Sequence, residues 1–295
     1  MSTLRELKSR IGSVASTQKT TSAMKMISSA KMRKATTQLQ RLSPYRNMVQ
    51  SVISHLLVTD QEFSSPLIAK REVKSVALVV FGSDDGLCGA FNINIFKQLL
   101  ETIDNVRKQY GNDVKVTILP VGKKLTKATL KIASDKVSVE RVDVLNTRSG
   151  SDDLSVFTNE LKNRFLNKDF DSVELLYMHF KSTSKQIFTR EQILPVSYES
   201  LAEEFDARAA NSPCLFEPDA AAIFESVLPL HVRAMMQEVF TESCASEQAS
   251  RVMAMQTASD NAGELLEALN LEYNKLRQQG ITTELLDILG GQVQR

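Results

Sequence analysis

The chain has 295 residues, of which 42% are hydrophobic and 24% charged, and these values are typical of a soluble globular protein with a sizeable core. The net charge of +1 conceals a strong asymmetry: residues 1–59 hold ten basic residues and one acid, whereas residues 199–295 hold six basic and sixteen acidic residues. A basic head and an acidic tail favour pairing of the two ends. The basic residues of this head are interleaved with Ser, Thr and Ala, and Tyr45 is its single aromatic residue, which argues against nucleic-acid binding.

Cysteine and histidine usage argues against a metal centre. The cysteines, Cys88, Cys214 and Cys244, are odd in number and lack Cys-x-x-Cys spacing, so we expect neither a disulfide framework nor a zinc site.

The N-terminus lacks the apolar run of a signal peptide, and the longest apolar run, residues 76–81, is too short to cross a membrane. We therefore expect a soluble, cytoplasmic chain without metal or cofactor.

Residues 3–57 read as one long helix. Leu4, Leu7, Ile11 and Val14 repeat at three- and four-residue steps, which is the pattern of a coiled-coil seam. The stripe then turns to Ala and Met, which allow close and adaptable contacts. Pro44 is expected to bend or locally open this helix.

In the middle of the chain, short β-branched apolar runs alternate with helical patterns. The predicted strands are 75–83, 114–122, 137–144, 172–180 and 192–197. The predicted helices are 91–111, 123–133 and 154–170. This alternation predicts a central α/β domain over 75–197 with a largely parallel sheet.

Residues 219–289 read as a second long helix, which Gly290 and Gly291 are expected to end. If the central domain brings its ends together, the two terminal helices can pair antiparallel. Exposed ion pairs contribute only about 0–1 kcal/mol each, so charge would select the partner while burial of the Leu, Met and Ala seam supplies stability. The predicted parts are coiled-coil arms over 1–58 and 217–295 around the α/β domain.

The turn GSDDGLCGAFN, residues 82–92, follows a strand and precedes a helix, where phosphate sites are often found. It matches neither Gly-x-x-x-x-Gly-Lys-[Ser/Thr] nor Gly-x-Gly-x-x-Gly, and Asp84 with Asp85 would repel a phosphate. We interpret it as a tight glycine turn, with a ligand site as the alternative. Cys88 has no histidine in this segment to activate it, which argues against a catalytic thiol.

Three segments together carry a resemblance to a known family. They are TQKTTSAMKMISSAKMRKA in the first helix, GLCGAFN in the middle, and SEQASRVMAMQTASDNAG with LEYNKLRQQGITTELLDILGG in the last helix. In this order they resemble the gamma subunit of F-type ATP synthases over essentially the whole chain.

The resemblance implies an antiparallel coiled coil with a Rossmann-like central domain, and the role of a rotor shaft rather than an enzyme. One copy would stand inside a hexamer of alpha and beta subunits, with its foot on the membrane-embedded c-ring beside the epsilon subunit. Each orientation of the shaft would favour a different beta conformation. The chain would then lie peripherally on the cytoplasmic face of a bacterial inner membrane.

The resemblance also assigns contact positions, none of them catalytic. Met24 and Lys25 match the segment that faces the moving loop of the beta subunit, although a seam position is the alternative for Met24. The expected beta contacts on the last helix are Arg251, Gln278 and Thr282. Glu217, in LFEPD, matches a foot position near the ring.

The chain departs from the family pattern at one charged position. Relatives commonly read Asp-Arg-Gly-Leu-Cys-Gly where this chain has Asp84-Asp85-Gly86-Leu87-Cys88-Gly89. Any ion pair made by that Arg is therefore in doubt here. The paired regulatory cysteines of chloroplast relatives are also missing, which favours a bacterial chain without thiol control.

Two other classes of function stay open on the residues alone. A Rossmann-type enzyme with coiled-coil arms would bind a nucleotide in the 75–197 domain. A nucleic-acid or membrane-surface protein would use the basic amphipathic segment 20–35. The acidic helix in the same chain favours a coiled-coil role for that segment instead.

Overall fold

A computed structural model describes residues 4–57, 63–197 and 216–292. The chain divides into two compact units, and each is treated by itself below. The first unit combines Met1–Ser29 with Arg251–Arg295, and the second is Ala30–Ser250. The predicted connector 198–216 lies almost wholly outside the described residues, as does Cys214.

Two long helices contribute to both units: α1 spans Leu4–Leu57 and α6 spans Ala220–Gln292. Pro44 lies inside α1, and the helix is continuous across it, so the predicted local opening does not occur. The prediction that Gly290 and Gly291 end the second helix was wrong, because α6 continues to Gln292. Glycine permits a left-handed helix end but does not impose one, and proline removes only one hydrogen bond from a long helix.

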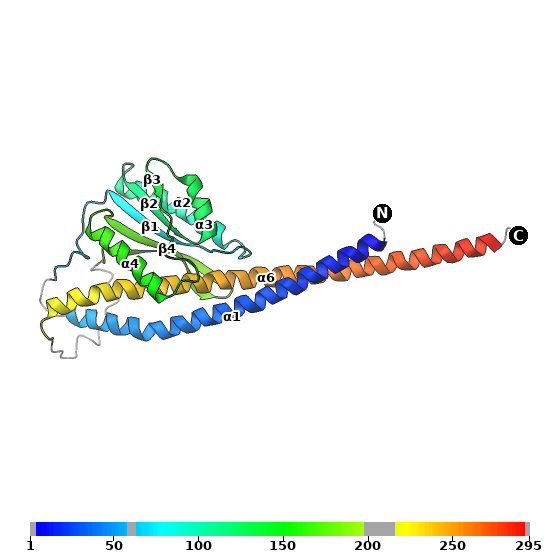
Figure 1. Ribbon diagram of the computed structural model, residues 1–295, viewed down its shortest axis with the longest axis horizontal. Helices are drawn as coiled ribbons and strands as arrows, with labels where there is room; N and C mark the ends of the chain where they lie inside the picture. Colours follow the sequence, from blue (N-terminus) through cyan, green and yellow to red (C-terminus); the bar gives the residue numbers. More distant parts are fainter. Residues whose placement is uncertain (1–3, 58–62, 198–215, 293–295) are drawn as a thin grey trace. The chain divides into compact units, whose positions relative to one another are not determined.

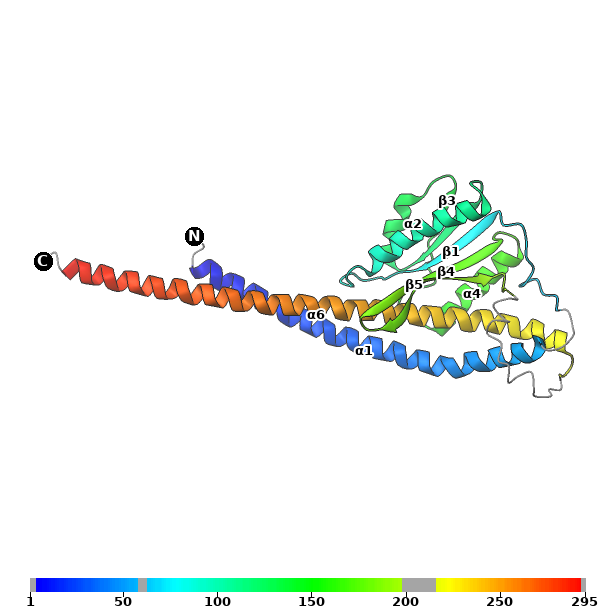
Figure 2. The same cartoon turned by 180° about the vertical axis from the view of Figure 1, so that it is seen from behind.

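In the first unit, segments of α1 and α6 run side by side in opposite directions (Figure 1; Figure 2). The buried side chains are widely spaced and several are small. They include Leu7, Thr21, Ser28, Met255, Ala262 and Leu269. A Cβ on Gly263 would lie 3.1 Å from Nε2 of Gln18, so this glycine allows the close contact between the two helices. The predicted seam is present only in part: Leu7 is buried as expected, but Ala23 and Met26 of the Ala and Met stripe are exposed, and Thr21 and Ser28 are buried instead.

The second unit contains a five-stranded sheet with the order β3-β2-β1-β4-β5. Its strands are β1 Ser75–Phe81, β2 Lys115–Val121, β3 Val137–Val139, β4 Ser172–Ser182 and β5 Lys185–Leu194. The first four are parallel, whereas β5 pairs antiparallel with β4. The sheet is therefore mixed, and this α/β fold with long terminal helices confirms the predicted fold class.

Two strand predictions had the wrong bounds. The strand predicted at 137–144 ends at Val139, and the last strand begins at Lys185 rather than at residue 192. The missed part of β5 reads KQIFTRE, which is mostly polar because β5 is an edge strand with one side open. A short turn between Ser182 and Lys185 joins it to β4.

Helices cover both faces of this sheet (Figure 1). On one face, α2 (Phe91–Tyr110) and α3 (Lys123–Thr129) pack on Val76, Leu78 and Val80 of β1, and the short helix η1 (Leu130–Ile132) follows α3. On the other face, Ala77, Val79 and Phe81 share a core with α4 (Ser151–Leu166) and with the parts of α1 and α6 in this unit. The long helices thus supply one wall of the α/β core. No described helix has a stretch long and apolar enough to cross a membrane.

Candidate functional site

The turn that follows β1 is built on direct glycine packing. A Cβ on Gly82 would lie 2.5 Å from Cβ of Leu125, and Gly122 has φ +105 with its Cβ position 2.9 Å from the backbone of Gly82. The amide of Gly82 also donates to the carbonyl of Val121 over 2.8 Å. Glycine is therefore required where the ends of β1 and β2 meet, and this supports the predicted tight turn.

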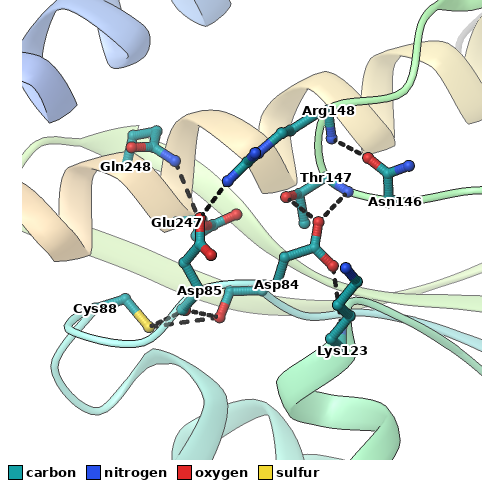
Figure 3. A network of polar contacts seen from close by, with 10 residues as sticks. Asp84, Asp85, Cys88, Lys123, Asn146, Thr147, Arg148, Glu247 and Gln248 are labelled. Carbon is teal, nitrogen blue, oxygen red and sulfur yellow. Dashed lines mark hydrogen bonds and ion pairs between the residues drawn. The ribbon is translucent and has the colours of Figure 1, made fainter.

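Asp84 connects this turn to two other segments (Figure 3). Its carboxylate accepts the Lys123 amide over 3.0 Å, and it accepts both the amide and the hydroxyl of Thr147, over 3.0 and 2.7 Å. Partial burial acts to raise the pKa of Asp84, but the hydrogen bonds from Thr147 and Lys123, with the charge of Lys123, outweigh it and lower that pKa. An internal carboxylate therefore takes the backbone donor that a phosphate would use.

Asp85 has a cationic partner within the chain. Its carboxylate lies 2.8 Å from a guanidinium nitrogen of Arg148, and this pair raises the pKa of Arg148 (Figure 3). Both side chains are largely exposed, so the pair contributes little to stability. Asp85 reverses the charge that relatives commonly carry at this position. Arg148, 63 positions further along the chain, supplies the opposite charge here.

Cys88 is buried within the turn, at 2% exposure. The side-chain amide of Asn92 donates to its sulfur over 3.4 Å and to the hydroxyl of Ser83 over 2.6 Å. This network holds the start of α2 against the end of β1. Across the described residues, no group of three or more His, Cys, Asp or Glu side chains is placed to hold a metal ion.

Polar contacts join the α/β part to the long helices within the second unit. His179 on β4 lies 2.8 Å from a carboxylate oxygen of Glu242 on α6, and the hydroxyl of Ser250 donates to Gln186 on β5 over 3.0 Å. Burial raises the pKa of Glu242, and the hydrogen bond from His179 opposes that shift. Cys244 on α6 also reaches the carbonyl of Thr147 over 3.7 Å. Together with the shared apolar core, these contacts hold the sheet against the parts of the long helices that belong to this unit.

The predicted beta-subunit contacts do not converge on one site. Arg251 and Gln278 are 27 positions apart on α6, which is about 40 Å at 1.5 Å per residue. Met24 and Lys25 are half-buried on α1, whereas Gln278 and Thr282 are exposed and joined by a hydrogen bond of 2.9 Å from the Thr282 hydroxyl to the Gln278 carbonyl. These positions follow the helices, as interaction surfaces do, and do not form a pocket.

Arg251 differs from the others because its side chain is only 6% exposed. Little of its surface is available to a partner in the isolated chain. Glu217 belongs to the second unit and lies exposed three residues before α6 begins, beside Pro218. It is therefore far along the chain from the other predicted contacts.

Sequence reasoning missed an exposed apolar group near the end of α6. Its members are Ile281, Leu285, Leu286 and Ile288, which are 51, 55, 63 and 63% exposed. Gln18 of α1 lies level with Gly263, so the start of α1 at Leu4 lies level with about residue 277 of α6. Beyond that point, α1 has no described residue opposite α6. The apolar residues that continue to repeat along this part of α6 were therefore the signal available in the sequence.

Comparison with known proteins agrees with this architecture. A family model described as ATP synthase matches residues 3–293. The ATP synthase gamma chain of Phocaeicola vulgatus is 41% identical over 301 aligned residues, covering 99% of each chain, and that of Bacteroides thetaiotaomicron is 39% identical and covers all of both.

Solved structures with this fold include a chain of the Euglena gracilis mitochondrial ATP synthase rotor, with a TM-score of 0.62 and 18% identity over 94% of this chain and 98% of that one. A second Euglena structure, of OSCP/F1/c-ring, gives a TM-score of 0.65 with 20% identity over 98% of this chain and 93% of the other. At such identities the likeness shows the fold. The family follows from the whole-length sequence matches: this chain is a member of the ATP synthase gamma chain family.

Proposed function

We propose that this chain is the rotor-shaft subunit of an ATP synthase, coupling ion-driven rotation of a membrane-embedded c-ring to the conformational cycle of catalytic beta subunits. The observation that carries the proposal is the 41% identity to a gamma chain over 99% of both sequences. Such a match leaves no large segment of this chain unaligned.

The chain itself is non-catalytic in this proposal. Its task is to present a different surface to each beta subunit, so that each orientation favours a different beta conformation. The exposed apolar group at the end of α6, Ile281 to Ile288, fits a position inside a surrounding protein, because such side chains are stabilised when they leave water.

The contact positions keep their proposed roles. Met24 and Lys25 face the moving loop of beta, and Gln278 with Thr282 form an exposed polar step on α6. Arg251 is buried, so its proposed contribution is to fix the local helix surface rather than to offer a wide contact. Glu217 is assigned to the foot near the ring and the epsilon subunit.

The proposed location is peripheral, on the cytoplasmic face of a bacterial plasma membrane. Two features support it: the relatives named above are bacterial, and no described helix is suited to cross a membrane. The chain would reach the membrane through the ring and not through lipid contacts of its own.

Copurification from the native membrane tests the assembly. We expect one copy of this chain with three alpha and three beta subunits, measured by native mass spectrometry of the detached complex. A stable homo-oligomer with ATPase activity and without those subunits would refute the rotor assignment.

Met24→Lys tests the shaft contact. A new cation at the beta interface should strengthen one orientation of the shaft relative to the others, so coupling should fall while ATP hydrolysis is largely retained. The measurement compares ATP hydrolysis with ATP-driven proton pumping in membrane vesicles. Met26→Lys is the matched control, because Met26 is 64% exposed and projects from a different side of the same helix.

The comparison separates an effect specific to position 24 from the effect of added charge on α1. If Met24→Lys and Met26→Lys reduce pumping per ATP equally, the effect belongs to added charge on α1 in general. If pumping per ATP is unchanged in Met24→Lys, Met24 is a seam residue and the contact assignment fails.

A further inference from the structure

A cavity of about 460 Å³ opens at the carboxyl-terminal edge of the parallel strands. It includes Gly122, which follows β2, together with Asp84 after β1 and residues 141–143, 145 and 146 after β3. Open parallel sheets bind ligands at this edge, and small-molecule sites commonly measure about 300–1,000 Å³. Position and size therefore both suit a small ligand.

One wall of the cavity is basic. Lys123, Lys124 and Lys127 come from α3, and Arg141 comes from the segment after β3. Within the described part of the chain, none of these four has an ion pair with a carboxylate. Only two carboxylates also line the cavity, so cations outnumber them by four to two.

The two carboxylates compensate the four cations only in part, since Asp84 interacts with the charge of Lys123 alone among them. Both oxygens of Asp84 already accept hydrogen bonds, from the Lys123 amide and from Thr147. Asp143 is exposed at the margin and forms no ion pair among the described residues. An added anion would therefore meet free ammonium and guanidinium donors.

The placement of these lysines lowers the stability of α3 itself. Lys123 and Lys124 occupy the first turn, where the positive end of the helix dipole disfavours cations. Lys127 lies three residues after Lys124 and four after Lys123, and like charges at these spacings on a helix repel each other. The helix has seven residues and no acid to offset this. Binding of an anion in the cavity would compensate for that local cost.

Three apolar side chains, hereafter the apolar wall, share the lining with the four basic residues. Leu145 is buried, Val142 is half-buried and Leu130 is 38% exposed. A purely inorganic anion would make no apolar contact with this wall, whereas the ring of a nucleoside would pack against it and remove it from water. The combination of a basic and an apolar wall is suited to a molecule that carries both groups.

We propose that this cavity binds a small phosphate-bearing anion, with the apolar wall favouring a nucleoside polyphosphate over free pyrophosphate. The proposal does not depend on the rotor function, since it concerns only the α/β part of the second unit. It also differs from a phosphate site in the turn 82–92, because its cations come from α3 and from the segment after β3 and not from that turn.

Calorimetric titration of the full-length chain with ATP and, separately, with sodium pyrophosphate tests the proposal, both without magnesium. We expect saturable one-to-one binding, weakened at least about tenfold in Lys124→Gln/Arg141→Gln, as for loss of charge-assisted contacts. Lys97→Gln/Lys108→Gln removes two exposed charges from α2, outside the cavity, and should bind like the parent. Leu130→Ala should weaken ATP binding but not pyrophosphate binding.

Several results would overturn the proposal. One is the absence of binding by either probe at millimolar concentration. Another is equal weakening in the cavity and control variants, which would show a response to net charge alone. A third is binding of a ten-residue polyglutamate peptide without binding of either phosphate, which would assign the basic wall to an acidic polypeptide. Equal affinity for ATP and pyrophosphate would refute the part assigned to the apolar wall.

Discussion

Asp84 is held by three donors from two separate segments of the second unit. Asp84→Asn keeps the size of the side chain but removes its charge and turns an amide group toward one set of donors. We expect the free energy of unfolding at pH 7 to fall by about 1 kcal/mol, which is below the usual range of about 1.5–3 kcal/mol for bonds to charged groups because the carboxylate is partly exposed. Urea denaturation measures this loss.

The stabilisation by Asp84 depends on pH, and the lowered pKa of Asp84 gives the direction of that dependence. Folding lowers the pKa of Asp84, so its stabilisation is complete above the unfolded value of about 3.9 and is lost as the pH falls through the lower folded value. The difference between parent and Asp84→Asn should therefore shrink below about pH 4. Asp104→Asn, an exposed position on α2, should show no such difference. A gap that widens in acid would contradict the role of the ionised carboxylate.

Asp85 and Arg148 form a charge pair that can be exchanged. Asp85→Arg places two guanidinium groups together, beside the two lysines, Lys31 and Lys34, that line the adjoining space, so the thermal midpoint should fall. Adding Arg148→Asp restores opposite charges and should recover most of that loss. Differential scanning fluorimetry at low and high salt checks this order, since screening should reduce both effects. Equal midpoints for Asp85→Arg and the double variant would show that the two side chains do not interact.

At the scale of elements, the strand-to-helix turn depends on close packing between Gly82 and Gly122. Gly82→Ala would clash with Leu125, and Gly122→Ala would combine a clash with positive φ, so each should cost about 1–3 kcal/mol or more. Gly12 on α1 is the control, because a Cβ there meets nothing within 4 Å. Gly12→Ala should stabilise the chain by up to about 1 kcal/mol. Urea midpoints that place all three variants together would contradict this packing account.

The elements differ in how far the sequence could predict them. The buried strands β1 and β2 and the helix α2 were placed within one or two residues, because their apolar patterns follow from burial on the sheet. The edge strand β5 was largely missed, since an edge carries polar residues that resemble a loop. Gly290 misled the prediction of the end of α6, because glycine weakens a helix without forbidding it.

At the scale of the whole molecule, residues that are proposed to act through contacts with other chains leave little trace in one structure. Met24, Gln278 and Thr282 were assigned by resemblance alone, and nothing in their local geometry singles them out. The partner of Asp85 was also unpredictable, because Arg148 meets it only through the fold. The exposed apolar end of α6 is different, since its pattern is visible in the sequence and its exposure in the structure.

That end supports a prediction that distinguishes stability of the chain from stability of the assembly. Deleting residues 281–295 removes Ile281, Leu285, Leu286 and Ile288, all more than half exposed, so the free energy of unfolding of the isolated chain should change by less than about 0.5 kcal/mol. In the complex with alpha and beta subunits, each of these side chains that becomes fully buried would contribute about 1.5–3 kcal/mol before ordering costs. The deletion should therefore lower the thermal midpoint of the complex.

Leu269→Ala provides the opposite control for this deletion. Leu269 is 4% exposed within the first unit, so its truncation should destabilise the isolated chain by about 2 kcal/mol or more. The deletion and Leu269→Ala should thus separate cleanly when both are measured on the chain alone and on the reconstituted complex. If the deletion destabilises the isolated chain as much as Leu269→Ala does, the end of α6 is stabilised within this chain. If the deletion leaves the thermal midpoint of the complex unchanged, the exposed apolar group is not a contact in the assembly. Burial of these side chains in the complex would stabilise it, and the deletion would remove that stabilisation.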